Sequence, residues 1–210
     1  MLAQQRWDPA SLRLIAITDS LRDGVDGLAS RAFAAVHGGA TMIHLRLAEE
    51  TPRVLCEAAS AIRALLPHVP LIVNGRFDIA LAVGASGVHL GVDDLPPTAV
   101  RRVVPPGFVI GASVGNAQEV ERALQADFVG IGPVFGRSDS EGSLGPVGFS
   151  TLARLCERPA VAIGGIDASN VAAVMAAGAA GIAVISALFG SRDPDAAARA
   201  LRQAQDASGT

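Results

Sequence analysis

Short runs of hydrophobic residues recur along this chain and alternate with longer stretches in which apolar residues follow a helical period. The apolar runs predict strands at Leu14–Thr18, Met42–Arg46, Leu71–Asn74, Gly87–Leu90, Val109–Ala112, Phe128–Gly132, Ala160–Ile163 and Ile182–Ile185. The stretches around them predict helices at Gly24–His37, Pro52–Leu66, Phe77–Val83, Pro96–Val104, Ala117–Gln125, Phe149–Cys156, Ser169–Ala177 and Asp195–Ala207. Strands that alternate with helices through short loops favour a parallel sheet with right-handed crossovers.

Glycine-containing phrases support this division of the chain. Gly38-Gly39-Ala40, Gly84-Ala85-Ser86 and Gly178-Ala179-Ala180 each follow a predicted helix and precede a strand, as glycine C-caps do. We therefore predict an α/β protein with one domain over residues 1–210, a (β/α)8 TIM barrel with residues 1–10 as an N-terminal extension. An open, doubly wound sheet is the alternative, because composition does not show that the sheet closes.

Composition narrows the classes of function. The 210 residues are half hydrophobic, which suits one well-filled domain, and the net charge of −3 gives no reason to expect binding of nucleic acid or of a membrane surface. No apolar run approaches the roughly 20 residues of a membrane span, and we expect a soluble, cytoplasmic protein. The basic residues are all arginine, so no lysine is present to form a Schiff base.

The last two predicted strands end in residues that leave backbone N–H groups uncovered. Gly164 and Gly165 follow one strand and have no side chains to block a ligand, while Ile185 and Ser186 end the other. Loops after strands 7 and 8 of such barrels commonly bind phosphate. We predict that these four residues bind a phosphate chiefly through backbone N–H groups. The alternative is that the paired glycines only form a tight turn.

The second predicted strand carries polar residues on one face. His44 and Arg46 share that face, whereas Ile43 and Leu45 share the other and should meet the helices. His44 and Arg46 therefore point into the barrel mouth. A histidine there can transfer a proton near neutral pH, and its alternative is a hydrogen-bonded interior histidine.

Arg46 ends its strand facing inward, where a cation needs an anion. Its planar guanidinium suits a substrate phosphate or carboxylate, and the alternative is an ion pair with Asp19 or Glu49. Asn74 and Ser113 end two other strands. Both can hydrogen-bond a heteroaromatic substrate, or they can cap the elements that follow.

Other polar segments have less specific interpretations. His89 lies between two apolar residues and is typical of a core histidine. Asp93-Asp94 can bind Mg²⁺, although the pair also suits a turn and a helix N-cap, which we favour. Residues 133–147 are rich in glycine and long enough for a mobile active-site loop. The histidines lack the spacing of metal ligands, so we predict no protein-bound metal.

These strand-end phrases, in this order, resemble the thiamin phosphate synthase and TenI family of small TIM barrels. The likeness extends from Ile15 to Pro194, nearly the whole chain. The matching phrases are Ile43-His-Leu-Arg46, Leu71-Ile-Val-Asn-Gly-Arg-Phe-Asp-Ile-Ala80, Gly87-Val-His-Leu-Gly91, Ile110-Gly-Ala-Ser113, Gly130-Ile-Gly-Pro-Val-Phe135, Ala162-Ile-Gly-Gly-Ile166 and Gly181-Ile-Ala-Val-Ile-Ser186.

The synthase branch of this family joins a pyrimidine pyrophosphate to thiazole phosphate with Mg²⁺ and releases pyrophosphate. The resemblance implies lysines on strand 2 and after strand 6, and this chain has none. Gly75 stands where the branch has a metal-binding aspartate, Val92 where it has glutamine, and Arg137-Ser-Asp-Ser140 where it has Thr-x-Thr-Lys. Losing a metal carboxylate and both lysines should raise the barrier to pyrophosphate release by several kcal/mol.

The TenI branch is a thiazole tautomerase that moves a proton and needs no metal. It carries Ile-His-x-Arg and Asn-Gly-Arg, which match His44, Arg46 and the phrase 74–76 here. The resemblance therefore favours a TenI-like tautomerase, an isomerase that binds a phosphorylated thiazole without a cofactor. Arg46 would hold the carboxylate, Asn74 and Ser113 would orient the ring, and His44 would transfer the proton. Pro133 stands where the branch has its own proton-transferring histidine.

Two alternatives remain. The first is a divergent synthase that uses Asp94 and Arg137, and it alone implies Mg²⁺. The second is a protein that binds a phosphorylated ligand without catalysis. A homodimer is implied by the family resemblance only.

Overall fold

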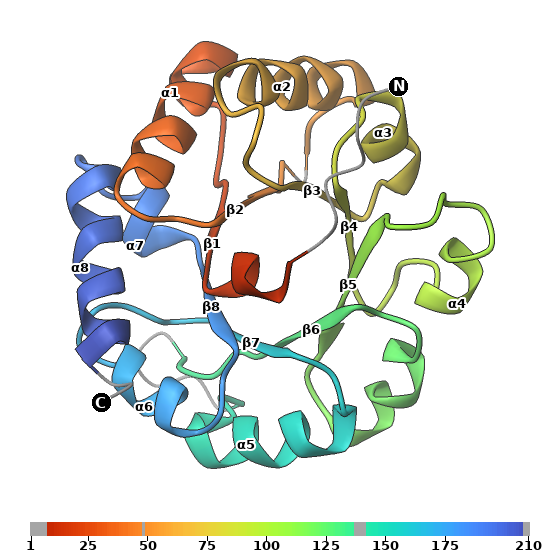
Figure 1. Ribbon diagram of the computed structural model, residues 1–210, viewed down its shortest axis with the longest axis vertical. Coiled ribbons are helices and arrows are strands. Elements are labelled where there is room, and N and C mark those ends of the chain that lie inside the picture. Colours follow the sequence, from red (N-terminus) through yellow and green to blue (C-terminus); the bar gives the residue numbers. More distant parts are fainter. Residues whose placement is uncertain (1–7, 48, 137–141, 208–210) are drawn as a thin grey trace.

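A computed structural model of the chain describes residues 8–47, 49–136 and 142–207. Parallel strands form a closed barrel in the order β1 to β8, and β1 pairs with β8 through Leu14 and Ile182 (Figure 1). None of the helices in these ranges is long and apolar enough to cross a membrane. The predicted single-domain (β/α)8 barrel is confirmed, and the open sheet is excluded because its two edge strands are paired.

The strands are β1 Leu14–Ile17, β2 Met42–Leu45, β3 Leu71–Asn74, β4 Gly87–Leu90, β5 Val109–Val114, β6 Phe128–Ile131, β7 Ala160–Ile163 and β8 Gly181–Val184. The α-helices are α1 Gly24–His37, α2 Pro52–Leu65, α3 Phe77–Ala82, α4 Pro97–Val100, α5 Gly145–Cys156, α6 Val171–Ala176, α7 Ser186–Phe189 and α8 Pro194–Ala207. Short 3-10 helices lie at η1 Pro9–Leu12, η2 Ala117–Glu119 and η3 Glu121–Ala123.

Alternation along each strand divides the core into two clusters. One face of the strands packs inside the barrel, as Ile17, Met42 and Phe128 do. The other face packs against the surrounding helices, as Ile43 and Leu45 do. Both faces are buried, which explains why the strands read as continuous apolar runs in the sequence. The predicted inward direction of the β2 face that carries His44 agrees with this division.

The N-terminal segment closes one end of the barrel. Helix η1 crosses the opening in Figure 1, and Leu12 is fully buried among the interior residues. Gly181 at the start of β8 has no room for a side chain, because an added Cβ would lie 2.6 Å from the carbonyl carbon of Leu12. Part of the predicted extension, residues 9 and 10, is therefore helical, and residues 1–7 lie outside the described ranges. The opposite end of the barrel stays open.

Several helix boundaries differ from those expected. The helix predicted at Pro96–Val104 is only α4, and the one predicted at Ala117–Gln125 is divided into η2 and η3. The Glu119 carboxylate accepts a hydrogen bond from the Gly115 N–H at 2.6 Å, and the Asn116 side chain accepts from the Glu119 N–H, so these contacts cap the start of η2. Helix α5 begins at Gly145, so the end of the predicted 133–147 loop is helical. Its middle, residues 137–141, lies outside the described ranges.

Candidate functional site

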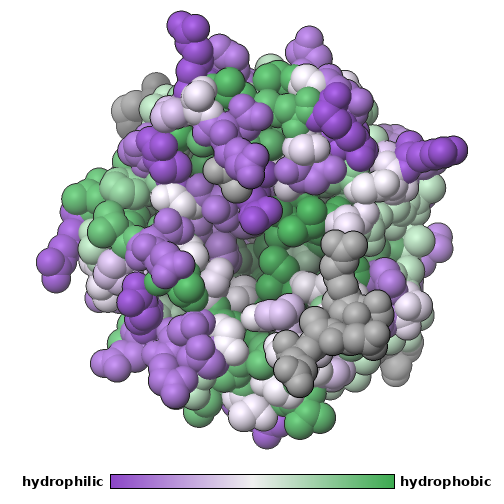
Figure 2. All heavy atoms as spheres, turned by 180° about the vertical axis from the view of Figure 1, so that it is seen from behind, coloured by the Kyte–Doolittle hydropathy of each residue, from purple (hydrophilic) through white to green (hydrophobic). Residues whose placement is uncertain are grey.

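The carboxyl ends of the strands open on the face opposite η1. Figure 2 shows this face, which is hollowed at its centre and bordered by both polar and hydrophobic side chains. Catalytic sites of such barrels lie at this end, because the βα loops meet there above a filled interior. The predicted site residues come from the ends of β2, β3, β5, β7 and β8.

The glycines after β7 are required by their backbone conformation and by a neighbouring loop. Gly164 has φ +97° and Gly165 has φ +63°, values that favour glycine. A Cβ on Gly164 would lie 2.7 Å from the Cα of Pro133, and one on Gly165 would lie 2.9 Å from the carbonyl carbon of Phe135. The β7–α6 turn thus packs directly on the loop that follows β6. The tight turn considered as the alternative is therefore present, and its backbone conformation also sets the direction of the two N–H groups.

Unpaired backbone donors gather at the last two junctions. Within the described ranges, the N–H groups of Gly164, Gly165 and Ser186 have no hydrogen-bond acceptor. Ile163 pairs with Ala183 across β7 and β8, so the two junctions follow from the same edge of the barrel at the same height. Uncovered N–H groups at neighbouring strand ends are typical of anion sites in proteins.

Ile185 joins β8 to the short helix α7. Its side chain is half-buried against the barrel interior, and its carbonyl accepts from the N–H groups of Leu188 at 3.1 Å and Phe189 at 2.8 Å. Ser186 is the first helical residue and is exposed. This four-residue helix was not predicted from the sequence. A short extra helix after strand 8 is a common part of phosphate sites in this fold.

His44 is buried on the inner face of β2, and its ring contacts Asn74 at the end of β3. The distance from His44 Nε2 to Asn74 Oδ1 is 3.1 Å. A carboxamide oxygen only accepts, so this contact requires the His44 proton on Nε2 and does not use the Asn74 NH₂ group. Asn74 does not cap α3, whose N-terminal residue has no side-chain cap. The structure thus joins two of the predicted residues directly.

A second buried histidine connects this pair to Ser113. The rings of His44 and His89 lie 5.1 Å apart between centroids, and His89 Nε2 lies 3.0 Å from Ser113 Oγ. Burial lowers the pKa of His89 to about 4. Burial, and then the nearby His89 and Arg46, lower the pKa of His44 well below its usual value, against the opposing effect of Asn74. Both rings are neutral at pH 7.

Glycines on two neighbouring strands make room for the His89 ring. A Cβ on Gly111 of β5 would lie 2.6 Å from His89 Nδ1, and one on Gly130 of β6 would lie 3.1 Å from His89 Cε1. The sequence indicated a core histidine, and the burial of His89 agrees with that interpretation. Its hydrogen bond to a predicted site residue was not foreseen.

Arg46 follows β2 at the rim, and its side chain is exposed. The Thr18 hydroxyl fixes its backbone, accepting from the Arg46 N–H at 2.8 Å and donating to the Arg46 carbonyl at 3.0 Å. The guanidinium has no ion pair within the part of the chain that the structure describes. Asp19, an alternative partner, instead pairs with Arg31 at 2.8 Å. Arg46 is thus available to a ligand.

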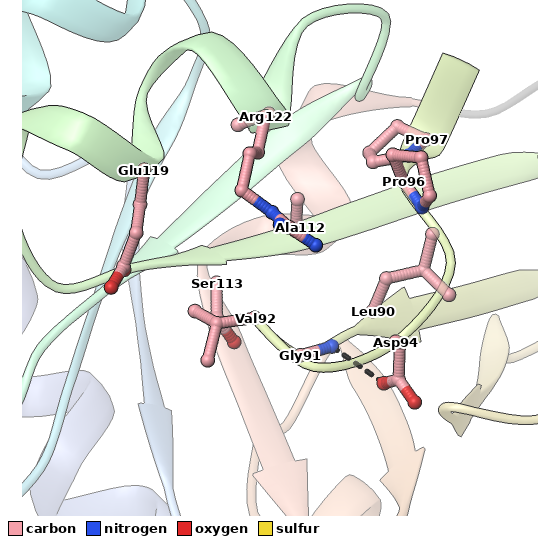
Figure 3. Close-up of a pocket in the computed structure, with 11 residues that line it drawn as sticks. Leu90, Gly91, Val92, Asp94, Pro96, Pro97, Ala112, Ser113, Glu119 and Arg122 are labelled. Carbon is pink, nitrogen blue, oxygen red and sulfur yellow. Dashed lines mark hydrogen bonds between the residues drawn. The ribbon is translucent and has the colours of Figure 1, made fainter. Parts of the chain in front are cut away.

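Asp94 lies beside the end of β3. Its Oδ2 accepts from the Gly91 N–H at 2.7 Å, and a Cβ on Gly75 would lie 3.1 and 3.2 Å from its two carboxylate oxygens. A small pocket opens here between the ends of β4 and β5, where Arg122 extends from η3 toward Ala112 (Figure 3). This pocket includes Ser113 but none of the residues predicted to bind phosphate. The pocket therefore lies apart from the predicted phosphate-binding residues.

The described residues contain no group of three or more histidine, cysteine, aspartate or glutamate side chains that could hold a metal ion. Asp94 supplies one carboxylate whose second oxygen has no hydrogen-bond donor in the same ranges. Magnesium is often bound by one or two carboxylates together with substrate phosphates and water. The donor set of the described residues therefore fits a Mg²⁺ ion that arrives with a phosphorylated substrate.

Comparison with known proteins identifies relatives over nearly the whole chain. A family model described as thiamine monophosphate synthase matches residues 14–188. A thiamine-phosphate synthase of Albidiferax ferrireducens is 43% identical over 204 residues, covering 94% of this chain and 93% of the relative. One of Methanoculleus marisnigri is 49% identical over 175 residues, 80% of this chain and 83% of the relative. The thiamine phosphate pyrophosphorylase structure from Pyrococcus furiosus has a TM-score of 0.85 at 34% identity, covering 95% of this chain and 98% of its own.

The prediction of a TenI-like thiazole tautomerase, an isomerase, is wrong. It depended on the phrases containing His44 and Asn74 and on the missing synthase lysines and metal carboxylate, whereas the similarity to proteins named thiamine-phosphate synthase extends over most of the chain. Short phrases at the rim of a barrel vary independently of the scaffold, so they discriminate poorly between branches of one family.

Proposed function

The chain belongs to the thiamin phosphate synthase and TenI family, and from this we propose that it is a thiamine-phosphate synthase. This transferase joins a pyrimidine pyrophosphate to a thiazole phosphate and releases pyrophosphate. The observation that supports the proposal most strongly is the two-part mouth. Unpaired backbone N–H groups lie after β7 and β8, and a cluster of polar side chains lies at the ends of β2, β3 and β5. A reaction between two substrates needs two such binding regions.

The backbone region suits the thiazole phosphate. The N–H groups of Gly164, Gly165 and Ser186 donate to phosphate oxygens, and Ile185 supplies an apolar surface beside them. Backbone donors are fixed by the barrel and need no reorganisation when the substrate binds. This region therefore holds the nucleophilic substrate in one orientation.

The side-chain region suits the pyrimidine and its pyrophosphate. His44 fixes the Asn74 carboxamide so that its NH₂ group donates to a ring acceptor, and His89 fixes the Ser113 hydroxyl in the same way. Arg46 binds the pyrophosphate, because it is exposed at the rim and carries a charge without an ion-pair partner in the described ranges. We propose that His44 orients Asn74. A neutral buried ring is a poor proton donor.

Magnesium completes the charge balance in this proposal. Asp94 is the residue that would hold it, together with oxygens of the pyrophosphate. When bound, the ion neutralises the negative charge that develops on the leaving group. Arg46 shares that task at the rim, which is consistent with a chain that has arginine but no lysine.

Incubation of the purified protein with the pyrimidine pyrophosphate, the thiazole phosphate and Mg²⁺ tests the proposal. We expect thiamin phosphate and pyrophosphate to form in equal amounts. Chromatography measures the first product, and a pyrophosphate assay measures the second. Removal of Mg²⁺ with EDTA should stop the reaction, and an excess of Mg²⁺ should restore it. Thermal stabilisation by thiazole phosphate without any product would instead indicate a binding protein that lacks the activity.

The expected cytoplasmic location and homodimer remain predictions. Fractionation of cells and light scattering of the purified protein test them separately. Neither result affects the assignment of the mouth residues.

A further inference from the structure

Helix α7 is too short to keep its own orientation. A four-residue helix contains about one turn, and isolated helices below roughly 12 residues are unstable in water. Leu188 and Phe189 are fully buried, whereas Ser186 at the other end is exposed. The direction of the Ser186 N–H therefore depends on contacts that hold the C-terminal end of the helix.

Two guanidinium groups bind that end. Arg22 Nη2 donates to the Phe189 carbonyl at 2.6 Å, and Arg31 Nη1 donates to the same oxygen at 3.3 Å. The Arg31 guanidinium carbon also lies 5.5 Å from the centre of the Phe189 ring. The last carbonyls of a helix have no donors within the helix and carry partial negative charge, which cations stabilise.

Arg31 is itself held in place by the loop after β1. Its Nη1 lies 2.8 Å from Asp19 Oδ1, its Nη2 donates to the Ser20 carbonyl at 2.8 Å, and its Nε lies 3.5 Å from Asp23 Oδ2. Only 10% of its side chain is exposed. Arg22 is 43% exposed, and its ion pair with Asp19 is longer, at 3.7 Å. Arg31 is therefore the more constrained of the two links between the β1–α1 loop and α7.

We propose that Arg31 is a positioning residue for phosphate binding. It acts through the Phe189 carbonyl and fixes α7 so that the N–H group of Ser186 faces the same ligand as that of Gly165. Arg31 lies on α1 and joins the β1–α1 loop to the C-terminal end of α7. The inference rests on the proposed thiazole phosphate substrate, and it adds a residue that no strand-end phrase contains.

Arg101 offers a matched control for Arg31. It also joins a carboxylate to two carbonyls, donating to Phe108 O at 2.7 Å, Gln125 O at 3.1 Å and Asp127 Oδ2 at 2.7 Å. Phe108 and Asp127 precede β5 and β6, so this network lies at the closed end of the barrel. Loss of either arginine should reduce stability, but only loss of Arg31 should alter phosphate binding.

The experiment compares Arg31→Gln and Arg101→Gln with the wild type by calorimetric titration, at a temperature where circular dichroism shows every variant folded. The probes are thiazole phosphate, the same thiazole without its phosphate, and inorganic phosphate. For Arg31→Gln we expect the Kd of both phosphate-containing probes to rise about tenfold, from loss of aligned donors. The Kd of the unphosphorylated thiazole should change less than about twofold, and Arg101→Gln should leave all three values unchanged.

Equal weakening of the phosphorylated and unphosphorylated thiazole in Arg31→Gln would overturn the inference, and so would unchanged binding of phosphate. If Arg31→Gln does not fold, Arg22→Gln replaces it, with a smaller rise of the same selectivity expected. Unchanged phosphate binding in that variant then counts against the inference. A wild type that binds inorganic phosphate in an Arg31-dependent way but not thiazole phosphate would refute the proposed substrate and retain the positioning role.

Discussion

The two sides of the barrel mouth present different kinds of hydrogen-bond donor. After β7 and β8 the available donors are backbone N–H groups of Gly164, Gly165 and Ser186. At the ends of β2, β3 and β5 they are side chains, connected through His44 and His89. Backbone donors persist as long as the turn keeps its shape, whereas a side-chain donor is lost with one substitution.

The departures from the synthase pattern follow this division. Gly75, Val92 and the missing strand-2 lysine all lie on the side-chain half, and the β7 and β8 phrases match the family. Arg137 belongs to the loop after β6, outside the described residues. The backbone half therefore identifies the family, and the side-chain half determines how the leaving group is handled. The variants below test these halves separately.

The largest effect is expected from Gly165→Ala in the backbone half. The new Cβ would overlap the Phe135 carbonyl at a position with φ +63°, so the turn must shift. We expect KM for thiazole phosphate to rise about a hundredfold and the free energy of unfolding to fall by about 2 kcal/mol. Gly178→Ala is the control, because Gly178 has φ +94° but nothing within 4 Å of an added Cβ. If steady-state kinetics give the same KM for thiazole phosphate in both variants, the shape of the Gly164–Gly165 turn does not determine phosphate binding.

A smaller effect is expected from Arg46→Gln in the side-chain half. Loss of the exposed guanidinium should lower kcat/KM about thirtyfold through weaker stabilisation of pyrophosphate. The free energy of unfolding, measured with urea, should stay within about 0.5 kcal/mol of the wild-type value, since an exposed residue contributes little to stability. Arg76→Gln removes a rim arginine that is already paired with Asp78 at 2.6 Å and should retain activity. Equal losses in both variants would argue for general rim charge instead of Arg46.

The smallest effect concerns the buried histidines. His89 has a pKa of about 4 in the folded protein against about 6.5 when unfolded, so the unfolded state binds more protons between these values. Stability should therefore fall as the pH drops through this range, by about 2 kcal/mol from His89 between pH 7 and pH 5. Urea unfolding across this range should show a shallower slope for His89→Gln than for wild type. His68→Gln, at an exposed position, controls for loss of a histidine. An unchanged slope in His89→Gln would show that other groups determine it.

The sequence predicted most of the scaffold because the barrel depends on local regularities. Apolar runs of strand length, helices with an apolar face and glycines after the helices each reflect a short-range constraint. The predictions of helix length failed at the fourth and fifth helices, where α4 is only four residues long and two short 3-10 helices, η2 and η3, replace one α-helix. The tautomerase prediction failed for another reason, since it relied on two matching phrases and on missing synthase residues at the rim, and these say less about the branch than similarity along most of the chain.

By itself, the sequence determined the alternation of strands and helices, the inward direction of His44 and the two glycine-bearing junctions. These follow from side-chain period and from the conformations that only glycine adopts freely. Only the tertiary structure decided that the sheet closes, that His44 contacts Asn74, and that Arg31 holds the end of α7. Those contacts join residues that lie far apart in the sequence. Their distances are set by the packing of the whole barrel, and no local pattern records them.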